Sequence, residues 1–142
     1  MSTPAEIAPI LEDCFNRRDG DLLLSLWADD FSYEGPGNTF AGKGRMLQQE
    51  QNLWVAFPDI CCEITPFIWG SDKVVFATRM RGTHQGPLRL GNGNIVAPTG
   101  RPVDFTLSVH LRFRHGRIAG ERVFYDTAGL QRQLGLLSPM TR

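Results

Sequence analysis

The sequence predicts an α+β domain in which helices cover one face of a strongly curved antiparallel sheet and enclose an apolar pocket. Three observations lead to this prediction. Helical periodicity is confined to the N-terminal part of the chain and to a short C-terminal stretch. Four long β-rich segments lie between them and form two hairpins. The chain has 142 residues, which is the size of one domain spanning residues 1–142.

The composition is that of an ordinary soluble globular protein, with 42% hydrophobic and 21% charged residues. Fifteen basic residues balance fifteen acidic residues, so no net field draws the chain toward nucleic acid or an anionic membrane. We therefore expect a small ligand without strong charge, and no nucleic-acid or membrane partner.

Three cysteines, Cys14, Cys61 and Cys62, lack the spacing of a disulfide framework or of a zinc site. The N-terminus has neither a basic region nor an apolar core of the kind found in signal peptides, and no apolar run is long enough to span a membrane. These features predict a reduced, cytoplasmic protein with no metal and no disulfide.

The N-terminal segment predicts two helices. Ser2–Pro4 offers a hydroxyl cap followed by proline in the first turn, and apolar residues then recur at helical spacing as far as Phe15. The polar run 16–20 ends this helix. Asp21 is expected to cap a second, shorter helix that extends to about Trp27.

A short strand is expected at residues 31–33, before a stretch rich in glycine turns. A third helix follows over residues 45–57, with apolar residues available for burial, and Pro58-Asp59 ends it.

The second half of the chain predicts long antiparallel strands. Residues 60–69 and 73–83 form one hairpin, and residues 102–114 and 117–125 form the other. The segment 84–101 between the hairpins is expected to be irregular. A short final helix follows the last strand.

Register in the second hairpin predicts which side chains face the pocket. If His115-Gly116 is the two-residue turn and no bulge intervenes, Phe105 pairs with Asp126. Because the face of the first strand that carries Phe105 is apolar, it is expected to face the core. Asp126 then lies on the interior face, together with Arg122 and Phe124.

Two histidines are placed by the same alternation. His110 pairs with Glu121 on the outer face of the sheet, whereas His84 continues the inner, apolar face of strand 73–83. Tyr33 lies on the short strand near the expected pocket. Periodicity alone therefore predicts an interior aspartate and an interior histidine.

An interior carboxylate has a raised pKa and can both accept and return a proton. For Asp126 this acid–base interpretation competes with a helix N-cap, which would lower its pKa instead. His84 either donates a hydrogen bond to a substrate oxygen or bonds to the loop that follows it. Tyr33 is a further possible donor, and Arg122 either pairs with Asp126 or extends outward.

Large apolar side chains are expected to pack in the core, and some of them to line the substrate pocket. The candidates for the pocket are Phe15, Trp54, Phe57, Phe76, Met80 and Phe124.

Several short stretches, taken in order, resemble one family. They are Phe15-Asn16 with Asp19, Ala56-Phe57-Pro58-Asp59, Gly82-Thr83-His84 with Gly86, Pro98-Thr99-Gly100-Arg101-Pro102, Arg112-Phe113 with Gly116 and Ile118, and Tyr125-Asp126 followed by Gln133-Leu134-Gly135. The ordered set spans most of the chain. It resembles the SnoaL-like polyketide cyclases, or ester cyclases, of the NTF2-like superfamily, which includes ketosteroid isomerase.

This resemblance implies an NTF2-like cone that forms a homodimer or homotetramer through its sheet. It also implies cofactor-free aldol ring closure of a polyketide ester, with Asp126 matching the acid–base aspartate at the end of the last long strand. His110 is the nearest match to the histidine that the characterised cyclases use, and His84 matches a histidine common in the ester-cyclase branch. Residues 88–97 form a longer connection than is usual in the family and are expected to affect access to the pocket.

The residues and the resemblance together predict a cofactor-independent enzyme that acts on a small hydrophobic carbonyl compound. Asp126 would take a proton from a carbon next to the carbonyl, and His84 or Tyr33 would stabilise the enolate oxygen. A ketosteroid-isomerase-like enzyme uses the same groups without forming a carbon–carbon bond. A non-catalytic small-molecule carrier, or an oligomerisation module, is the alternative from another class.

Overall fold

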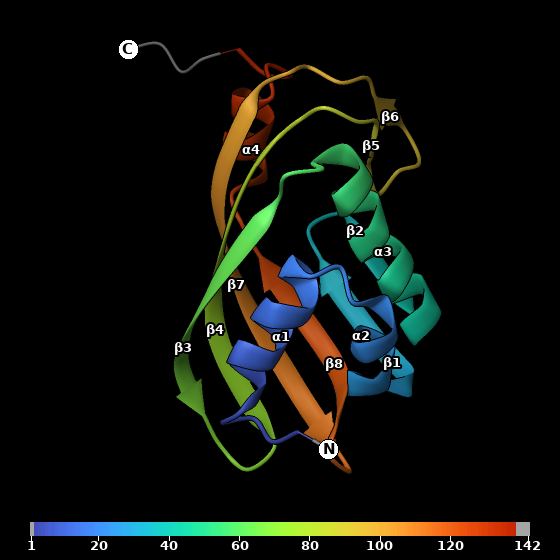
Figure 1. Ribbon diagram of the computed structural model, residues 1–142, viewed down its shortest axis with the longest axis vertical. Helices are drawn as coiled ribbons and strands as arrows, with labels where there is room; N and C mark the ends of the chain where they lie inside the picture. The colour runs from blue at the N-terminus through green and yellow to red at the C-terminus, as the bar shows by residue number, and fades with distance from the viewer. Residues whose placement is uncertain (1, 139–142) are drawn as a thin grey trace.

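The computed structural model describes residues 2–138, in which helices pack on one side of a curved six-stranded sheet (Figure 1). The helices are α1 (Ile7–Asn16), α2 (Gly20–Leu26), α3 (Lys43–Ala56) and α4 (Thr127–Gln133). The strands are β1 (Trp27–Gly35), β2 (Asn38–Ala41), β3 (Cys61–Trp69), β4 (Lys73–Thr83), β5 (Leu88–Arg89), β6 (Ile95–Val96), β7 (Pro102–Arg114) and β8 (Arg117–Phe124). The α+β fold class predicted from the sequence is confirmed.

The start of α2 and the length of β1 differ from the sequence prediction. Asp19, and not Asp21, is the N-cap of α2, and its side chain accepts a hydrogen bond of 3.1 Å from the backbone N–H of Leu22. Trp27 adopts an extended conformation and opens β1, so this strand is much longer than the predicted segment 31–33. Trp27 is buried in the hydrophobic core, and its packing takes precedence over the helical pattern.

The sheet has the order β2-β1-β8-β7-β4-β3 and is mixed. Both long hairpins form as predicted, but β1 runs parallel to β8, so the expectation of a fully antiparallel sheet is wrong at this pair. The two strands lie far apart in the sequence, and a parallel pair of this kind leaves no hairpin signal between them. The segment 84–101 also contains a small hairpin, β5–β6, which lies beside α3 at the upper end of the molecule (Figure 1).

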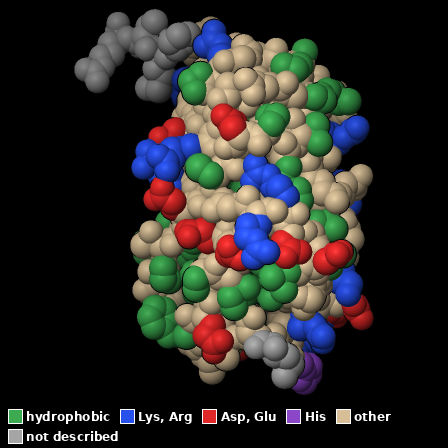
Figure 2. All heavy atoms as spheres, in the orientation of Figure 1, with side chains coloured by type: hydrophobic (Ala, Val, Ile, Leu, Met, Phe, Trp, Pro, Cys, Tyr) green, Lys and Arg blue, Asp and Glu red, His purple; other side chains and the backbone are tan. Residues whose placement is uncertain are grey.

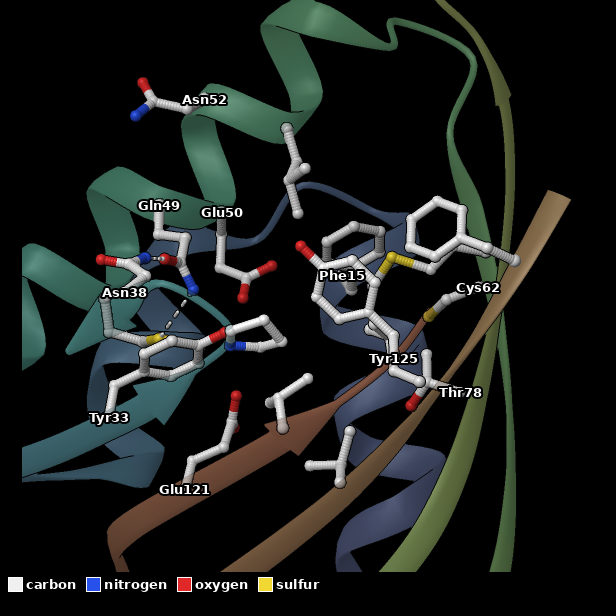
Figure 3. A pocket seen from close by; sticks show the side chains of 18 of the residues that line it. Phe15, Tyr33, Asn38, Gln49, Glu50, Asn52, Cys62, Thr78, Glu121 and Tyr125 are labelled. Carbon is white, nitrogen blue, oxygen red and sulfur yellow. Dashed lines mark hydrogen bonds between the residues drawn. The ribbon is translucent and has the colours of Figure 1, made fainter. Parts of the chain in front are cut away.

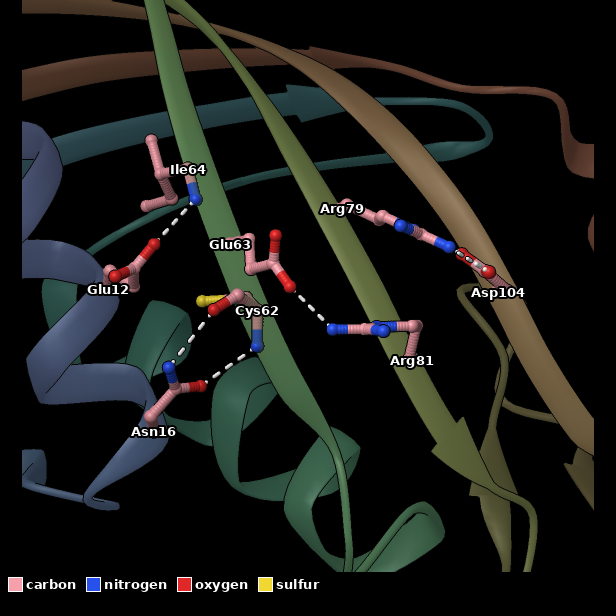
Figure 4. A network of polar contacts seen from close by, with 8 residues as sticks. All are labelled: Glu12, Asn16, Cys62, Glu63, Ile64, Arg79, Arg81 and Asp104. Atoms are coloured by element: carbon pink, nitrogen blue, oxygen red, sulfur yellow. Dashed lines mark hydrogen bonds and ion pairs between the residues drawn. The ribbon is translucent and has the colours of Figure 1, made fainter.

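Helix α1 is tied to the edge strand β3 by side-chain to backbone hydrogen bonds (Figure 4). The amide of Asn16 donates to the carbonyl of Cys62 at 3.0 Å and accepts from its N–H at 2.8 Å. The carboxylate of Glu12 accepts from the N–H of Ile64 at 2.7 Å. These bonds satisfy backbone groups of an edge strand and hold α1 across the concave face of the sheet, where it forms one wall of the interior.

Figure 2 shows acidic and basic side chains interspersed on the face in view, in agreement with the balanced composition. No helix within residues 2–138 is long and apolar enough to cross a membrane.

Three large apolar side chains at the end of β3, Phe67, Ile68 and Trp69, are each more than half exposed. The predicted dimer or tetramer and the cytoplasmic location stay predictions.

Candidate active site

A β-bulge in β8 determines which side chains enter the pocket. The turn forms as predicted, with positive φ at both His115 (53°) and Gly116 (73°). Beyond the turn, however, Arg112 pairs with Gly120, and Ala119 is the extra residue. One inserted residue exchanges the two faces of the remaining strand. The predicted register is therefore wrong for every position after the bulge.

Arg122 and Phe124 consequently lie on the outer face of the sheet and not in the interior. The guanidinium of Arg122 donates to the carboxylate of Glu34 at 2.8 Å. Phe124 is 53% exposed and meets the ring of His110 edge-on, with ring centroids 5.4 Å apart. His110 lies on the outer face as the register predicted, but its partner across the hairpin is Arg122 and not Glu121.

Asp126 is exposed and caps α4. Its carboxylate accepts a hydrogen bond of 2.9 Å from the backbone N–H of Gly129. Because of the bulge, the strand does not direct this side chain into the pocket. The interior position that motivated an acid–base role for Asp126 is thus contradicted, and the capping interpretation describes its geometry.

We predict that two substitutions of Asp126 distinguish a helix-capping role from a catalytic role. Asp126→Asn keeps a good N-cap and should leave both stability and activity unchanged, whereas Asp126→Ala should cost about 1 kcal/mol of unfolding free energy. Chemical denaturation of the two variants measures this difference. A large loss of activity in the well-folded Asp126→Asn variant would restore the catalytic interpretation.

A pocket with a volume of about 280 Å³ lies between the helices and the concave face of the sheet. Five of the side chains singled out from the sequence line it: Phe15, Tyr33, Phe57, Phe76 and Met80. Trp54 is not among the lining residues and packs against Phe15, with ring centroids 5.7 Å apart. The lining is mostly apolar, as expected for a site that binds a small hydrophobic molecule.

Two carboxyl groups face one another inside this pocket (Figure 3). Glu121 extends from β8, directly opposite the buried Leu111 of β7, and is only partly exposed. Glu50 extends from the middle of α3 on the other side of the pocket, and it too is only partly exposed. Neither forms an ion pair within the described part of the chain.

Burial makes both groups weaker acids. Removal from water raises the pKa of Glu50 from 4.5 to about 7. Removal from water, together with the negative charge of Glu50, raises the pKa of Glu121 from 4.5 to about 8. Between about pH 7 and pH 8 one carboxyl group of the pair is therefore ionised while the other keeps its proton, in the same apolar pocket.

Two tyrosine hydroxyls accompany the carboxyl pair (Figure 3). Tyr33 pairs with Glu121 across the β1–β8 ladder, and its pKa is raised first by burial and then by the charge of Glu121. Tyr125 lines the pocket next to Phe105, and burial raises its pKa as well. Both phenols remain protonated over the physiological range and act as hydrogen-bond donors. Within residues 2–138, no group of three or more His, Cys, Asp or Glu side chains is arranged to hold a metal ion.

His84 is fully buried but does not line the pocket. Its Nδ1 accepts a hydrogen bond of 3.2 Å from the N–H of Thr99 and lies 2.9 Å from the hydroxyl of the same residue. The backbone of His84 also pairs with Arg101 and Gly100, and its ring packs against Phe57. The loop-bonding interpretation therefore describes this histidine, which anchors the segment between β4 and β7.

We predict that His84 makes the fold sensitive to acid. Burial lowers its pKa, with partial compensation from the backbone of Gly86. As the pH falls through the ordinary value of 6.5, the unfolded chain binds a proton that the folded chain does not, so stability is lost. The unfolding free energy of wild type minus that of His84→Gln should decrease from about pH 7 to pH 5. The control variant Gln85→Asn, which changes the exposed neighbour of His84 and no titrating group, should show no such change, and an equal change in both would contradict this role.

The sequence contains signals that place Glu50 and Glu121 in the interior, but strict alternation along the strands does not include them. Glu50 follows Met46 by four residues and precedes Leu53 by three, which places it on the buried face of the helix. Ala119-Gly120 is a pair of small residues inside a strand, and glycine in a strand often marks a bulge. With the bulge included, the inward set becomes Glu121, Val123 and Tyr125.

Comparisons with solved structures agree with this architecture. AclR, a proposed hydroxylase from Streptomyces galilaeus, matches with 26% identity and a TM-score of 0.77 over 96% of this chain and 84% of that one. IdmH, a proposed polyketide cyclase from Streptomyces antibioticus, matches with 27% identity and a TM-score of 0.76 over 93% of this chain and 98% of that one. A protein with a ketosteroid isomerase-like fold from Catenulispora acidiphila matches with 18% identity and a TM-score of 0.73 over 96% of this chain and 98% of that one, which shows that the fold is shared.

No curated protein matches the chain. The family model for SnoaL-like polyketide cyclases matches residues 5–134, which include β8 with Glu121, α3 with Glu50 and all the strands that surround the pocket. The resemblance stated from short sequence stretches is confirmed, and the chain belongs to the SnoaL-like polyketide cyclase family.

Proposed function

We propose that the protein catalyses acid–base chemistry at a carbon next to a carbonyl group, in the intramolecular aldol cyclisation of a small hydrophobic compound. The observation that carries the proposal is the carboxyl pair, Glu50 and Glu121, whose side chains face one another in an apolar pocket and whose pKa values are both raised. A site of this kind offers a base and an acid at the same pH. Membership of the cyclase family supports the direction of the proposal.

Glu50 is the proposed base. It faces Glu121 from α3, whereas Glu121 lies beside Tyr33, a hydrogen-bond donor, across the β1–β8 ladder. We therefore assign the carboxylate of the pair to Glu50. A carboxylate with a pKa close to the working pH is a much stronger base than an exposed one. It removes the proton from the carbon next to the carbonyl and leaves an enolate.

Glu121 is the proposed acid. In its protonated form it donates a hydrogen bond to the enolate oxygen, and the hydroxyls of Tyr33 and Tyr125 are additional donors in the same pocket. The enolate carbon then attacks a second carbonyl of the same molecule, and Glu121 supplies the proton to the new alkoxide. The proton held by Glu50 returns to Glu121, so the cycle consumes no proton and needs no oxidant.

The pocket also has a positioning role. Its apolar walls, including Phe15, Phe76 and Met80, exclude water and fold a flexible chain so that its two carbonyls approach one another. An isomerase would use the same two proton transfers on a substrate that lacks the second carbonyl. The two functions therefore differ in the substrate and not in the groups that act on it.

Deuterium exchange tests the proposed chemistry without knowledge of the natural substrate. The full chain is incubated with 2-tetralone, a small apolar ketone, in buffered deuterium oxide near neutral pH, and loss of the proton signal next to the carbonyl is followed by NMR. We expect exchange well above that in buffer alone, and at the same rate for the Asp126→Asn control. Saturable binding of the ketone without any added exchange would instead identify a carrier.

A further inference from the structure

Two arginines at the mouth of the pocket indicate part of the substrate's chemistry. We infer that the substrate carries an anionic oxygen group, a carboxylate or a phosphate, and this inference rests on the proposed function. The anionic group stays at the mouth between Arg45 and Arg89, while the carbonyl part of the substrate enters the apolar interior. The balanced net charge of the chain predicts a ligand without strong charge, and this local arrangement modifies that expectation.

The exposed lining residues show where the pocket opens. Among all the residues that line it, the exposed ones are Pro36, Arg45, Arg89 and Gly91. They come from the β1–β2 turn, the first turn of α3, strand β5 and the β5–β6 turn. The mouth thus lies between α3 and these two hairpin turns, and both of its charged residues are arginines.

Contacts hold the side chain of Arg45 and the backbone of Arg89. The guanidinium of Arg45 lies over the ring of Phe40 at 5.3 Å, and its Nη1 donates to Gln48 at 3.2 Å. Arg89 pairs with Ile95 in the β5–β6 hairpin, and this hairpin packs against the side of α3. The hairpin is the part of the chain that the sequence identified as longer than usual in the family.

Neither arginine has a carboxylate partner within residues 2–138, although at least six other basic side chains of the protein do. A guanidinium that has no carboxylate partner of its own and lies at a pocket mouth can bind the carboxylate or phosphate of a ligand through two parallel hydrogen bonds. The pocket interior instead contains Glu50 and Glu121, which would repel an anion. The charges therefore favour a single orientation of the substrate, with the anionic end outward.

Binding of three matched probes to the full chain tests this inference. The probes are 2-naphthylacetate, 2-naphthyl phosphate and the neutral methyl 2-naphthylacetate, measured by calorimetry near pH 6, where Glu50 and Glu121 are both protonated. We expect at least one anion to bind roughly tenfold more tightly than the ester. The Arg45→Gln/Arg89→Gln variant should lose that preference and bind the ester as wild type does.

Arg117→Gln is the matched control, because Arg117 is exposed and lies at the opposite end of the molecule, beside the β7–β8 turn (Figure 1). It should keep the full preference for the anion. Whether 2-naphthylacetate or 2-naphthyl phosphate binds more tightly shows whether the anionic group of the substrate is a carboxylate or a phosphate. Equal binding of all three probes to wild type, or a preference that survives in the double arginine variant, would overturn the inference. Since only binding is measured, failure here is distinct from failure to exchange protons.

Discussion

Replacing Glu50 by glutamine should lower the rate of deuterium exchange into 2-tetralone by about a hundredfold or more. Glutamine has nearly the same shape and stays in the pocket, but it cannot accept the proton from carbon. The loss should therefore appear in kcat, with little change in the affinity for the ketone. NMR exchange rates at several ketone concentrations separate the two quantities.

The matched control is Glu63→Gln, which removes a carboxylate from the outer face of β3, where Glu63 pairs with Arg81 at 2.5 Å. This variant should exchange protons at the wild-type rate. If Glu50→Gln retained half of the wild-type rate or more, Glu50 would not be the base.

The pH profile of the same reaction distinguishes the two members of the pair. In wild type the rate should rise near pH 7 as one carboxyl group of the pair ionises and fall near pH 8 as the other ionises. In Glu121→Gln the falling limb should disappear, because the amide does not titrate. A wild-type rate that continues to rise to high pH would contradict the role of Glu121 as the acid.

The second large effect is a loss of stability as the pH rises. Both carboxyl groups have a pKa above 4.5 in the folded chain, so the folded state binds protons more tightly than the unfolded state does. Their contribution is fully present below about pH 4.5 and is lost between about pH 4.5 and 8. The shift of Glu50 alone, to about 7, corresponds to about 3 kcal/mol.

A loss of this size should lower the melting temperature by roughly 10 °C between pH 5 and pH 9. The double variant Glu50→Gln/Glu121→Gln should remove most of this dependence, and Glu63→Gln should retain it. His84 contributes in the opposite direction below about pH 6.5, so the double variant should become less stable on acidification. A wild-type melting temperature that does not change between pH 6 and pH 9 would contradict the burial of two weak acids.

The sequence predicted the fold class because its signals are local and repeated. Alternation along β4 and β7, and the left-handed turn at His115-Gly116, follow from residues that are neighbours in the chain. The parallel pairing of β1 with β8 depends on contacts between distant segments, which alternation does not encode. The small β5–β6 hairpin was likewise hidden in a segment rich in glycine and proline.

The candidate site was predicted only in part, and the reason is one residue. Alternation assigned the apolar pocket walls, because Phe76 and Met80 belong to a long regular strand. The bulge at Ala119 then exchanged the faces of β8, so that Glu121 entered the pocket and Asp126 became a surface cap. Alternation of apolar and polar residues does not reveal a bulge, and the small residues Ala119-Gly120 are the only local sign of it in this strand.

The most direct test of the account is a titration of the glutamate side chains by carbon-13 NMR, with assignments from Glu50→Gln and Glu121→Gln. We predict that Glu50 and Glu121 both titrate above pH 6, and that removing Glu50 lowers the pKa of Glu121 because the neighbouring charge is gone. Two carboxyl groups that titrate independently near pH 4.5 would contradict a buried, interacting pair in the pocket, and with it the proposed acid–base chemistry.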